Sequence, residues 1–190
     1  SSKKILRVIK NELSEIKKTY GDERRTKVVK GGVKMLSMED IIPDEDTVVV
    51  LTKGGYIKRT NPSEYRQQKR GGIGVHDLNT KEEDFITTLL TATTHNDVLF
   101  FTNAGKVYQS KMFEIPEGKR ATKGKSIMNF LPLTQGEEIT SVLALPKAAR
   151  EIKDLALLMV TKNGIVKKAS AQSFIDVRRS GIIALKLKKG

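Results

Sequence analysis

The sequence predicts an all-β protein of propeller-like, four-stranded blades, about three of them, preceded by one N-terminal α-helix. An apolar stripe at helical spacing is confined to the first twenty residues. Short β-rich runs, divided by Gly, Pro, Asn and Asp, fill the chain beyond residue 35. A glycine pattern recurs there about every fifty residues, and such a period is typical of blade arrays.

The N-terminal helix is predicted from the spacing of its apolar residues. These recur at intervals of four, four, three and four and so share one face: Ile5, Ile9, Leu13, Ile16 and Tyr20. Ser2 is suited to cap the start, and Gly21 stands where a left-handed C-terminal residue belongs. Because so narrow a stripe does not fold alone, we expect it to pack on another surface. A helix lying on a membrane surface is the alternative.

The remaining chain is predicted to form strands. Apolar runs of the length of buried strands precede tight polar turns at 48–51, 98–101 and 155–160, and an alternating strand follows each turn. The predicted strands are 48–52, 55–60, 73–78 and 86–92; then 98–102, 106–110, 125–130 and 138–144; then 156–161, 165–169 and 182–187. This division gives blades over about 45–95 and 96–150, and an incomplete one over 151–190.

Glycines at two places in each unit define the repeat. Gly55, Gly105 and Gly164 end tight turns and lie 50 and then 59 residues apart. Two-residue hairpin turns need a positive φ, which glycine adopts at no steric cost. A second glycine follows 19, 19 and 17 residues later and precedes a third strand: Gly74, Gly124 and Gly181. Agreement at both places in three units indicates a true repeat.

The charge balance indicates a polyanionic partner. The chain has 35 Lys and Arg against 22 Asp and Glu, a net charge of +13. Because Cys is absent, disulfides and thiolate metal sites are excluded, and the two His, far apart at His76 and His95, do not suit a zinc site. No apolar run reaches the length of a membrane span and no secretory leader is evident, so we expect a folded intracellular protein without a metal site.

No nucleotide-binding or hydrolase motif is complete. Segment 118–126 resembles a P-loop, but its two glycines lie six residues apart where the motif has five, and no helix is predicted after it. Asp77 stands where a dinucleotide-binding fingerprint beginning at Gly72 has its third glycine. A Gly-x-Ser-x-Gly elbow is absent, and we interpret the acidic groups at 82–84 and 137–138 as solvated turn residues. We therefore assign no catalytic residue.

One segment combines basic side chains with three glycines: Gln68, Lys69, Arg70, Gly71, Gly72, Ile73 and Gly74. The glycines let backbone N–H groups approach a phosphate closely, while Lys69 and Arg70 supply positive charge. The arginine fork can grip one phosphate through two hydrogen bonds. From the residues alone, a glycine-rich connection with merely solvated basic side chains remains the alternative.

Two segments resemble those of the A-type subunits of bacterial DNA gyrase. The predicted helix ends in Tyr-Gly-Asp-Glu-Arg-Arg-Thr (20–26), like the end of the breakage-reunion domain of that family. Segment 68–74 resembles the family's signature box, whose pattern is Gln, basic, Arg, Gly, Gly, basic, Gly; six of the seven positions match, and Ile73 departs from it. The resemblance covers essentially all 190 residues.

The resemblance implies a division near residue 35. Residues 1–34 correspond to the end of the breakage-reunion domain and a linker, and 35–190 to roughly the first three of six blades of the C-terminal β-pinwheel. In that family the domain wraps duplex DNA and supports ATP-dependent negative supercoiling in the bacterial cytoplasm. The cleaving tyrosine, which follows an Arg in the family, has no counterpart here. ATP and Mg²⁺ bind elsewhere in a holoenzyme that contains the gyrase B protein and the rest of the gyrase A protein, so we expect no cofactor in this chain.

Basic residues that recur from blade to blade are the candidates for phosphate contacts on a DNA-binding rim. Outside segment 68–74 they are Arg59, Arg66, Lys119, Arg120, Lys123, Lys125, Lys167, Arg178 and Arg179. For each of them, a merely solvated role stays open. Lys58 and Arg59 point to opposite sides of a strand, so at most one of them faces DNA.

Two other functions remain as alternatives. The A-type subunit of topoisomerase IV looks similar but carries a degraded box and usually fewer blades. A propeller that serves as a protein-interaction platform would be expected to have a neutral or mixed surface and aromatic-rich blades. The net charge of +13 and the aromatic content of 5% disfavour that platform.

Overall fold

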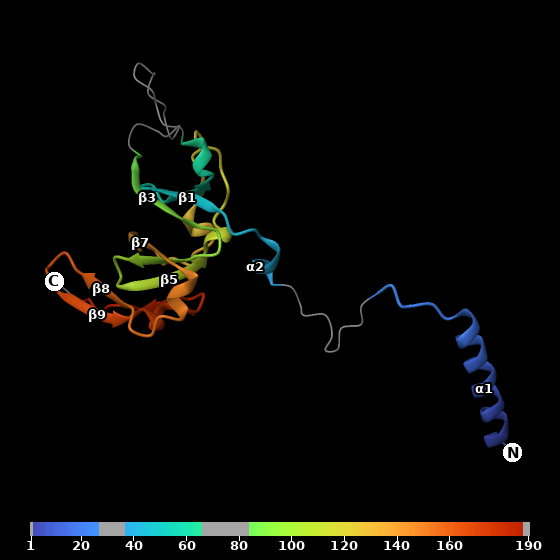
Figure 1. Ribbon diagram of the computed structural model, residues 1–190. Coiled ribbons are helices and arrows are strands. Elements are labelled where there is room, and N and C mark those ends of the chain that lie inside the picture. Colours follow the sequence, from blue (N-terminus) through green and yellow to red (C-terminus); the bar gives the residue numbers. More distant parts are fainter. Residues whose placement is uncertain (1, 27–36, 66–83, 188–190) are drawn as a thin grey trace. The chain divides into compact units, whose positions relative to one another are not determined.

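The computed structural model describes residues 2–26, 37–65 and 84–187 of the chain (Figure 1). Two compact units are present, Ser1–Leu36 and Ser37–Gly190. The described part of the first contains one long helix, and the described part of the second contains three β-sheets. The short helix α2 (Met38–Ile41) precedes the first strand. Short helical turns lie between later strands: η1 (Pro62–Glu64), η2 (Met112–Glu114), η3 (Ile127–Asn129), η4 (Lys147–Arg150) and η5 (Ala171–Phe174).

Helix α1 (Ser2–Tyr20) confirms the predicted N-terminal helix. Two details of its ends differ from the prediction: Ser2 lies within the helix, and Gly21 does not adopt a positive φ. The Gly21 amide instead continues the helical pattern and donates to the Lys17 carbonyl at 3.0 Å. Among the described residues α1 buries no side chain, and Leu13 on its apolar face is 60% exposed.

The first sheet contains β1 (Asp46–Thr52), β2 (Tyr56–Thr60), β3 (Ile86–Thr93) and β6 (Lys125–Ser126), in the order β3-β1-β2-β6. The second contains β4 (Asp97–Thr102), β5 (Lys106–Lys111), β7 (Ile139–Leu145) and β10 (Ile182–Ile183), in the order β10-β5-β4-β7. The described part of the third contains β8 (Ala156–Val160) and β9 (Val166–Ser170). Neighbouring strands are antiparallel, and the sequence placed the first, second and fourth strands of the first two units correctly.

In the second and third units, the third strand does not join the sheet of its own unit, and here the prediction was wrong. Residues 125–126 pair with β2 of the preceding unit, and residues 182–183 pair with β5 of the preceding unit. Both strands are two residues long, and η3 occupies 127–129 where a strand was predicted. An unpaired strand edge must satisfy its N–H and C=O groups, and the following unit supplies partners for them. Segment 73–78 lies outside the described residues.

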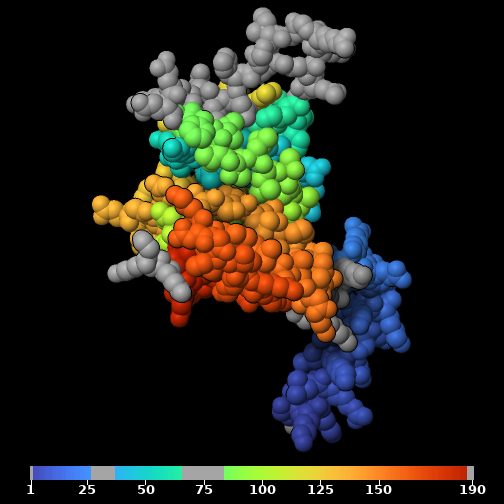
Figure 2. All heavy atoms as spheres, turned by 90° about the vertical axis from the view of Figure 1, so that its left-hand side faces the viewer, coloured from blue at the N-terminus to red at the C-terminus, as the bar shows by residue number. Residues whose placement is uncertain are grey.

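The second sheet is buried on both faces, which accounts for the continuous apolar run in β4. Val98 and Phe100 point into a core shared with the first sheet, and Leu99 points into a core shared with the third. Strand β3 (green in Figure 2) lies against β7 of the second unit. The predicted positive φ is present at the turn glycines Gly55 (76°) and Gly105 (74°). The predicted two-residue turns are wrong, because each glycine ends a three-residue loop, 53–55 or 103–105, between paired strands.

Candidate nucleic-acid interface

Four predicted rim residues lie together on one segment, here called the basic loop (residues 118–125), which leads into β6. Lys119 and Lys125 are exposed on it, and Arg120 and Lys123 are half-buried. Since β6 pairs with β2, the second unit carries this loop along the edge of the first sheet. The structure therefore brings together the second-unit candidates Lys119, Arg120, Lys123 and Lys125, as the sequence grouped them.

Backbone hydrogen bonds fasten the basic loop to β2. The Arg59 amide donates to the Pro116 carbonyl at 2.8 Å, and the Gly118 amide donates to the Arg59 carbonyl at 2.9 Å. The Thr60 hydroxyl also donates to the Gly118 carbonyl, at 2.9 Å. These bonds fix the position of the first residues of the loop on the edge of the first sheet.

Lys58 lies beneath the loop and holds its carbonyls. The residue is only 1% exposed, and its Nζ donates to the carbonyl of Lys119 at 3.3 Å and to that of Arg120. Burial of an ammonium group is costly unless polar groups surround it, so these bonds constrain both partners. Sequence reasoning allowed one of Lys58 and Arg59 to face DNA; the structure buries Lys58.

Side chains of the first unit also orient the cations of the loop. Lys123 Nζ lies 3.7 Å from the centre of the Tyr56 ring, and the Arg120 guanidinium lies 4.9 Å from that of Tyr65. The Arg120 amide donates to a carboxylate oxygen of Glu64 at 2.6 Å. Sequence reasoning did not identify Tyr56, Tyr65 or Glu64, because each lies about sixty residues away from its partner in the chain.

Arg59 connects neighbouring units. Its Nε donates to the Ile115 carbonyl at 2.9 Å, its guanidinium lies 3.2 Å from the Glu117 carboxylate, and its side chain is 21% exposed. Fifty residues later Gln109 makes comparable bonds, from Nε2 to the Ile175 carbonyl at 2.7 Å and from the Val177 amide to its Oε1 at 2.7 Å. This position thus ties each unit to the next.

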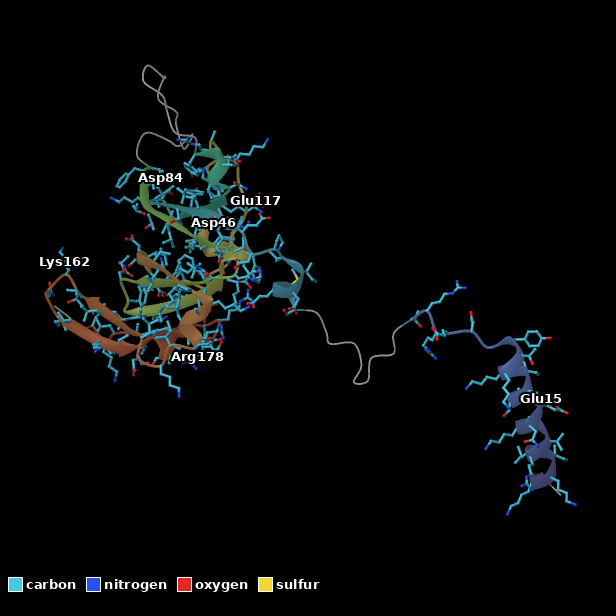
Figure 3. The ribbon with its side chains drawn as sticks, in the orientation of Figure 1. Glu15, Asp46, Asp84, Glu117, Lys162 and Arg178 are labelled. Atoms are coloured by element: carbon cyan, nitrogen blue, oxygen red, sulfur yellow. The ribbon has the colours of Figure 1, made fainter. Side chains whose placement is uncertain are left out.

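The third-unit candidates lie on other sheets. Arg178 and Arg179 are in the turn that leads into β10 of the second sheet, and Arg178 Nε donates to the Gly181 carbonyl at 3.2 Å. Lys167 is exposed on β9 of the third sheet, and its Nζ donates to the Ala184 carbonyl at 2.6 Å. Figure 3 marks Arg178 and the turn residue Lys162 on this part of the molecule. The described candidates are thus spread over three sheets.

The remaining candidates lie outside the described residues. They are Arg66 and the segment Gln68, Lys69, Arg70, Gly71, Gly72, Ile73 and Gly74. Their assignment to DNA binding stays a prediction.

The acidic turn residue Glu137 is buried, which corrects the prediction of a solvated side chain. Its side chain is 1% exposed and accepts hydrogen bonds from the hydroxyls of Thr102, Tyr108 and Thr134 at 2.8, 3.0 and 2.8 Å. Burial by itself raises the pKa of Glu137, but these bonds and one from the Thr134 amide outweigh it and lower the pKa to about 2. In the first unit Asp84 similarly accepts bonds from the Thr52 hydroxyl and the Gly54 amide (Figure 3).

Neither a metal centre nor a membrane-spanning helix appears in the described ranges. No group of three or more His, Asp or Glu side chains there is placed to hold a metal ion. No described helix is both long and apolar enough to cross a membrane.

Blades that exchange strands and carry basic loops on their edges define a propeller-like β-array with a cationic surface. The family model described as "DNA gyrase C-terminal domain, beta-propeller" matches residues 46–93, 96–146 and 156–190. The chain belongs to this family.

Relatives support the same family. The A-type subunits of DNA gyrase from Clostridium acetobutylicum and Staphylococcus epidermidis are each 43% identical over 97% of this chain. The chain spans 22% and 20% of those relatives, about a fifth of their length. A solved DNA gyrase A C-terminal domain is similar with a TM-score of 0.61 and 29% identity, over 76% of this chain and 44% of the other. The corresponding values for a solved C-terminal domain of DNA topoisomerase IV are 0.60, 28%, 78% and 44%.

Proposed function

We propose that the chain binds duplex DNA through its phosphates and wraps it around the basic edges of its blades. Smooth bending of a site of 20–30 bp costs about 1–6 kcal/mol, which counterion release at many phosphate contacts can offset. Wrapping of this kind needs contacts spread along a curved surface and no reading of bases.

One observation carries the proposal: a basic loop that contains glycines near its ends is hydrogen-bonded to the edge of the preceding blade. The basic loop 118–125 is bound to β2, and the turn with Arg178 and Arg179 leads into β10 on the edge of β5. Segment 68–74 has the same place in the first unit of the sequence, 19 residues from turn glycine to loop glycine. Recurrence of cations at one place per blade suits a continuous phosphate track.

In the cell, the chain would act within a DNA gyrase holoenzyme in the bacterial cytoplasm. The gyrase B protein and the remainder of the gyrase A protein are the proposed partners, and ATP and Mg²⁺ would bind those other parts. The chain itself would supply DNA wrapping for ATP-dependent negative supercoiling, and the bond-breaking chemistry would lie elsewhere. This division follows the resemblance to gyrase A proteins, of which the chain spans about a fifth.

The test is ligation of nicked circular DNA in the presence of the chain, followed by removal of the protein. Chiral wrapping is expected to leave a positive shift in linking number. Salt-sensitive binding without any shift would contradict wrapping by these blades. Ligation with an equally basic, unstructured polypeptide is the control for non-specific charge.

The C-terminal domain of the A-type protein of topoisomerase IV, binding DNA without chiral wrapping, is the second candidate. The likeness to a solved topoisomerase IV domain, with a TM-score of 0.60, nearly equals the value of 0.61 for gyrase A. The linking-number experiment separates the two, since we expect the positive shift only from a gyrase-type domain.

A further inference from the structure

Lys58 is out of reach of DNA, yet it contacts the basic loop directly. At 1% exposure its ammonium cannot form an ion pair with a phosphate at the surface. Its hydrogen bonds go to the Lys119 and Arg120 carbonyls, within the loop. Any influence of Lys58 on DNA binding therefore passes through the shape of that loop.

We propose that Lys58 is a positioning residue for DNA binding: it holds the basic loop of the next unit in the shape that presents Lys119 and Lys125 to phosphates. This inference rests on the proposed DNA-binding function. The Tyr56 ring contributes to the same role by fixing Lys123.

The contacts of Lys58 extend across the whole loop. A Cβ built on Gly118 would lie 3.5 Å from the Lys58 Cβ, and one on Gly124 would lie 3.1 Å from it. The Lys58 stem therefore lies close to both glycine ends of the loop, and the ammonium contacts the residues between them. With the ammonium removed, two carbonyls lose their donor, and the loop must be ordered again when DNA binds.

The equivalent residue of the second unit makes different contacts. Tyr108 lies fifty residues after Lys58 and is also buried, against Gly181 of the following turn. Its hydroxyl donates to Glu137 of its own unit at 3.0 Å. The second junction holds its turn through Gln109, which is the counterpart of Arg59 and not of Lys58. Lys58 is thus not required by the fold at this position.

A variant set on the full 190-residue chain tests the proposal: Lys58→Met, Lys119→Ala with Lys125→Ala, and the triple variant. Met keeps an aliphatic stem and removes the ammonium. Affinity for a labelled, mixed-sequence duplex of about 30 bp is measured over a series of salt concentrations. The slope of log K against log salt is negative, and each lost phosphate contact reduces its magnitude by about 0.9.

We expect the double variant to reduce the magnitude of this slope by about 2, and Lys58→Met to reduce it by about 1 to 2. In the triple variant, Lys58→Met should add no further loss, because its effect passes through the two lysines. An equal loss from Lys58→Met with and without Lys119 and Lys125 would overturn the positioning role. A wild-type chain without salt-dependent binding would overturn the DNA-binding function and this inference together.

A second pair of variants keeps the proposal testable if Lys58→Met does not fold. Tyr56→Phe retains the ring beneath Lys123, and Tyr56→Leu removes it. We expect the Phe variant to bind like the wild type and the Leu variant to lose two- to five-fold in affinity, as for a cation–π contact of about 0.5–1 kcal/mol. Equal binding by both variants would contradict the role of the ring.

Discussion

Gly124 is the residue where the path of the basic loop depends most directly on the absence of a side chain. Its φ is 84°, and a Cβ there would lie 2.6 Å from the Ile57 carbonyl oxygen. Gly136 has a similar φ of 79°, but nothing lies within 4 Å of its Cβ position. A comparison of substitutions at these two glycines therefore distinguishes the cost of backbone strain from the cost of steric overlap.

Gly124→Ala is expected to destabilise the fold more than Gly136→Ala. A left-handed conformation costs an alanine about 1–2 kcal/mol at either position. At Gly124 the overlap with the neighbouring strand adds about 1–3 kcal/mol. Urea unfolding of both variants measures the difference, and equal losses of stability would show that β6 can move away from β2 without cost.

Glu137 makes stability depend on pH. Its pKa in the folded protein is about 2, below the ordinary value of 4.5, because hydroxyl and amide donors surround the carboxylate. The deprotonated form is therefore favoured by folding. Its contribution is fully present above about pH 4.5, and it is lost as the pH falls towards 2.

Glu137→Gln is expected to lower the free energy of unfolding by about 3 kcal/mol at pH 7. The difference from the wild type should shrink as the pH falls from 4.5 towards 2, since the wild type then loses its charged acceptor. Urea unfolding between pH 7 and 3 checks this. Glu138→Gln, at the exposed neighbouring residue, is the control, and a difference that stays constant with pH would contradict the assignment.

Strand exchange makes each blade depend on the next one along the chain. β6 and β10 are only two residues long, so side-chain bonds must add to their pairing. Gln109 provides two such bonds between the second and third units, each of 2.7 Å. Asn103 provides a similar pair within the second unit, to Gly136 and from Glu138.

Gln109→Leu is expected to lower stability by about 2 kcal/mol, because a carbonyl and an amide lose their partner. Amide hydrogen exchange at Val177 and Ile182 should become faster. Asn103→Leu removes a matched pair of bonds and should leave exchange at these two amides unchanged. Unchanged exchange in Gln109→Leu would contradict the view that this side chain joins the units.

The distribution of charge is expected to determine the salt dependence and the sequence tolerance of DNA binding. The net charge of +13 predicts affinity that is tolerant of sequence and falls steeply with salt. Several cations are used internally: Lys111 lies 2.9 Å from Asp97 and 2.6 Å from Glu39, and Arg150 lies 3.1 Å from Asp97. At the basic loop, the Lys58 ammonium binds the Lys119 carbonyl, the Lys123 ammonium lies over the Tyr56 ring, and the Arg120 amide donates to Glu64.

Lys69→Ala with Arg70→Ala is expected to reduce the linking-number shift more than affinity for a straight duplex of about 30 bp, because wrapping needs the whole track and simple binding does not. Lys3→Ala with Lys4→Ala, on α1, makes the same change in net charge and is the matched control. Equal losses in wrapping and in short-duplex binding would contradict a special role for segment 68–74.

Local signals were sufficient for much of the fold. Apolar spacing predicted α1, and positive-φ glycines such as Gly105 marked the hairpins, because both depend on residues close in sequence. The sheet that receives Lys125 could not be predicted, since a two-residue strand carries no periodic signal. The burial of Glu137 was missed because its donors Thr102 and Tyr108 lie about thirty residues upstream.

The amino-acid sequence by itself determined the repeat, the all-β architecture, the basic character and the candidate loops, because composition, glycine spacing and apolar patterns are local properties. The exchange of strands between blades, the burial of Lys58 and the internal use of Arg59 emerged only in the folded chain. Each of these depends on which edge of a sheet is left unpaired after the hairpins form. Pairing of distant edges is fixed by hydrogen bonding and packing in three dimensions, and residue order alone does not record it.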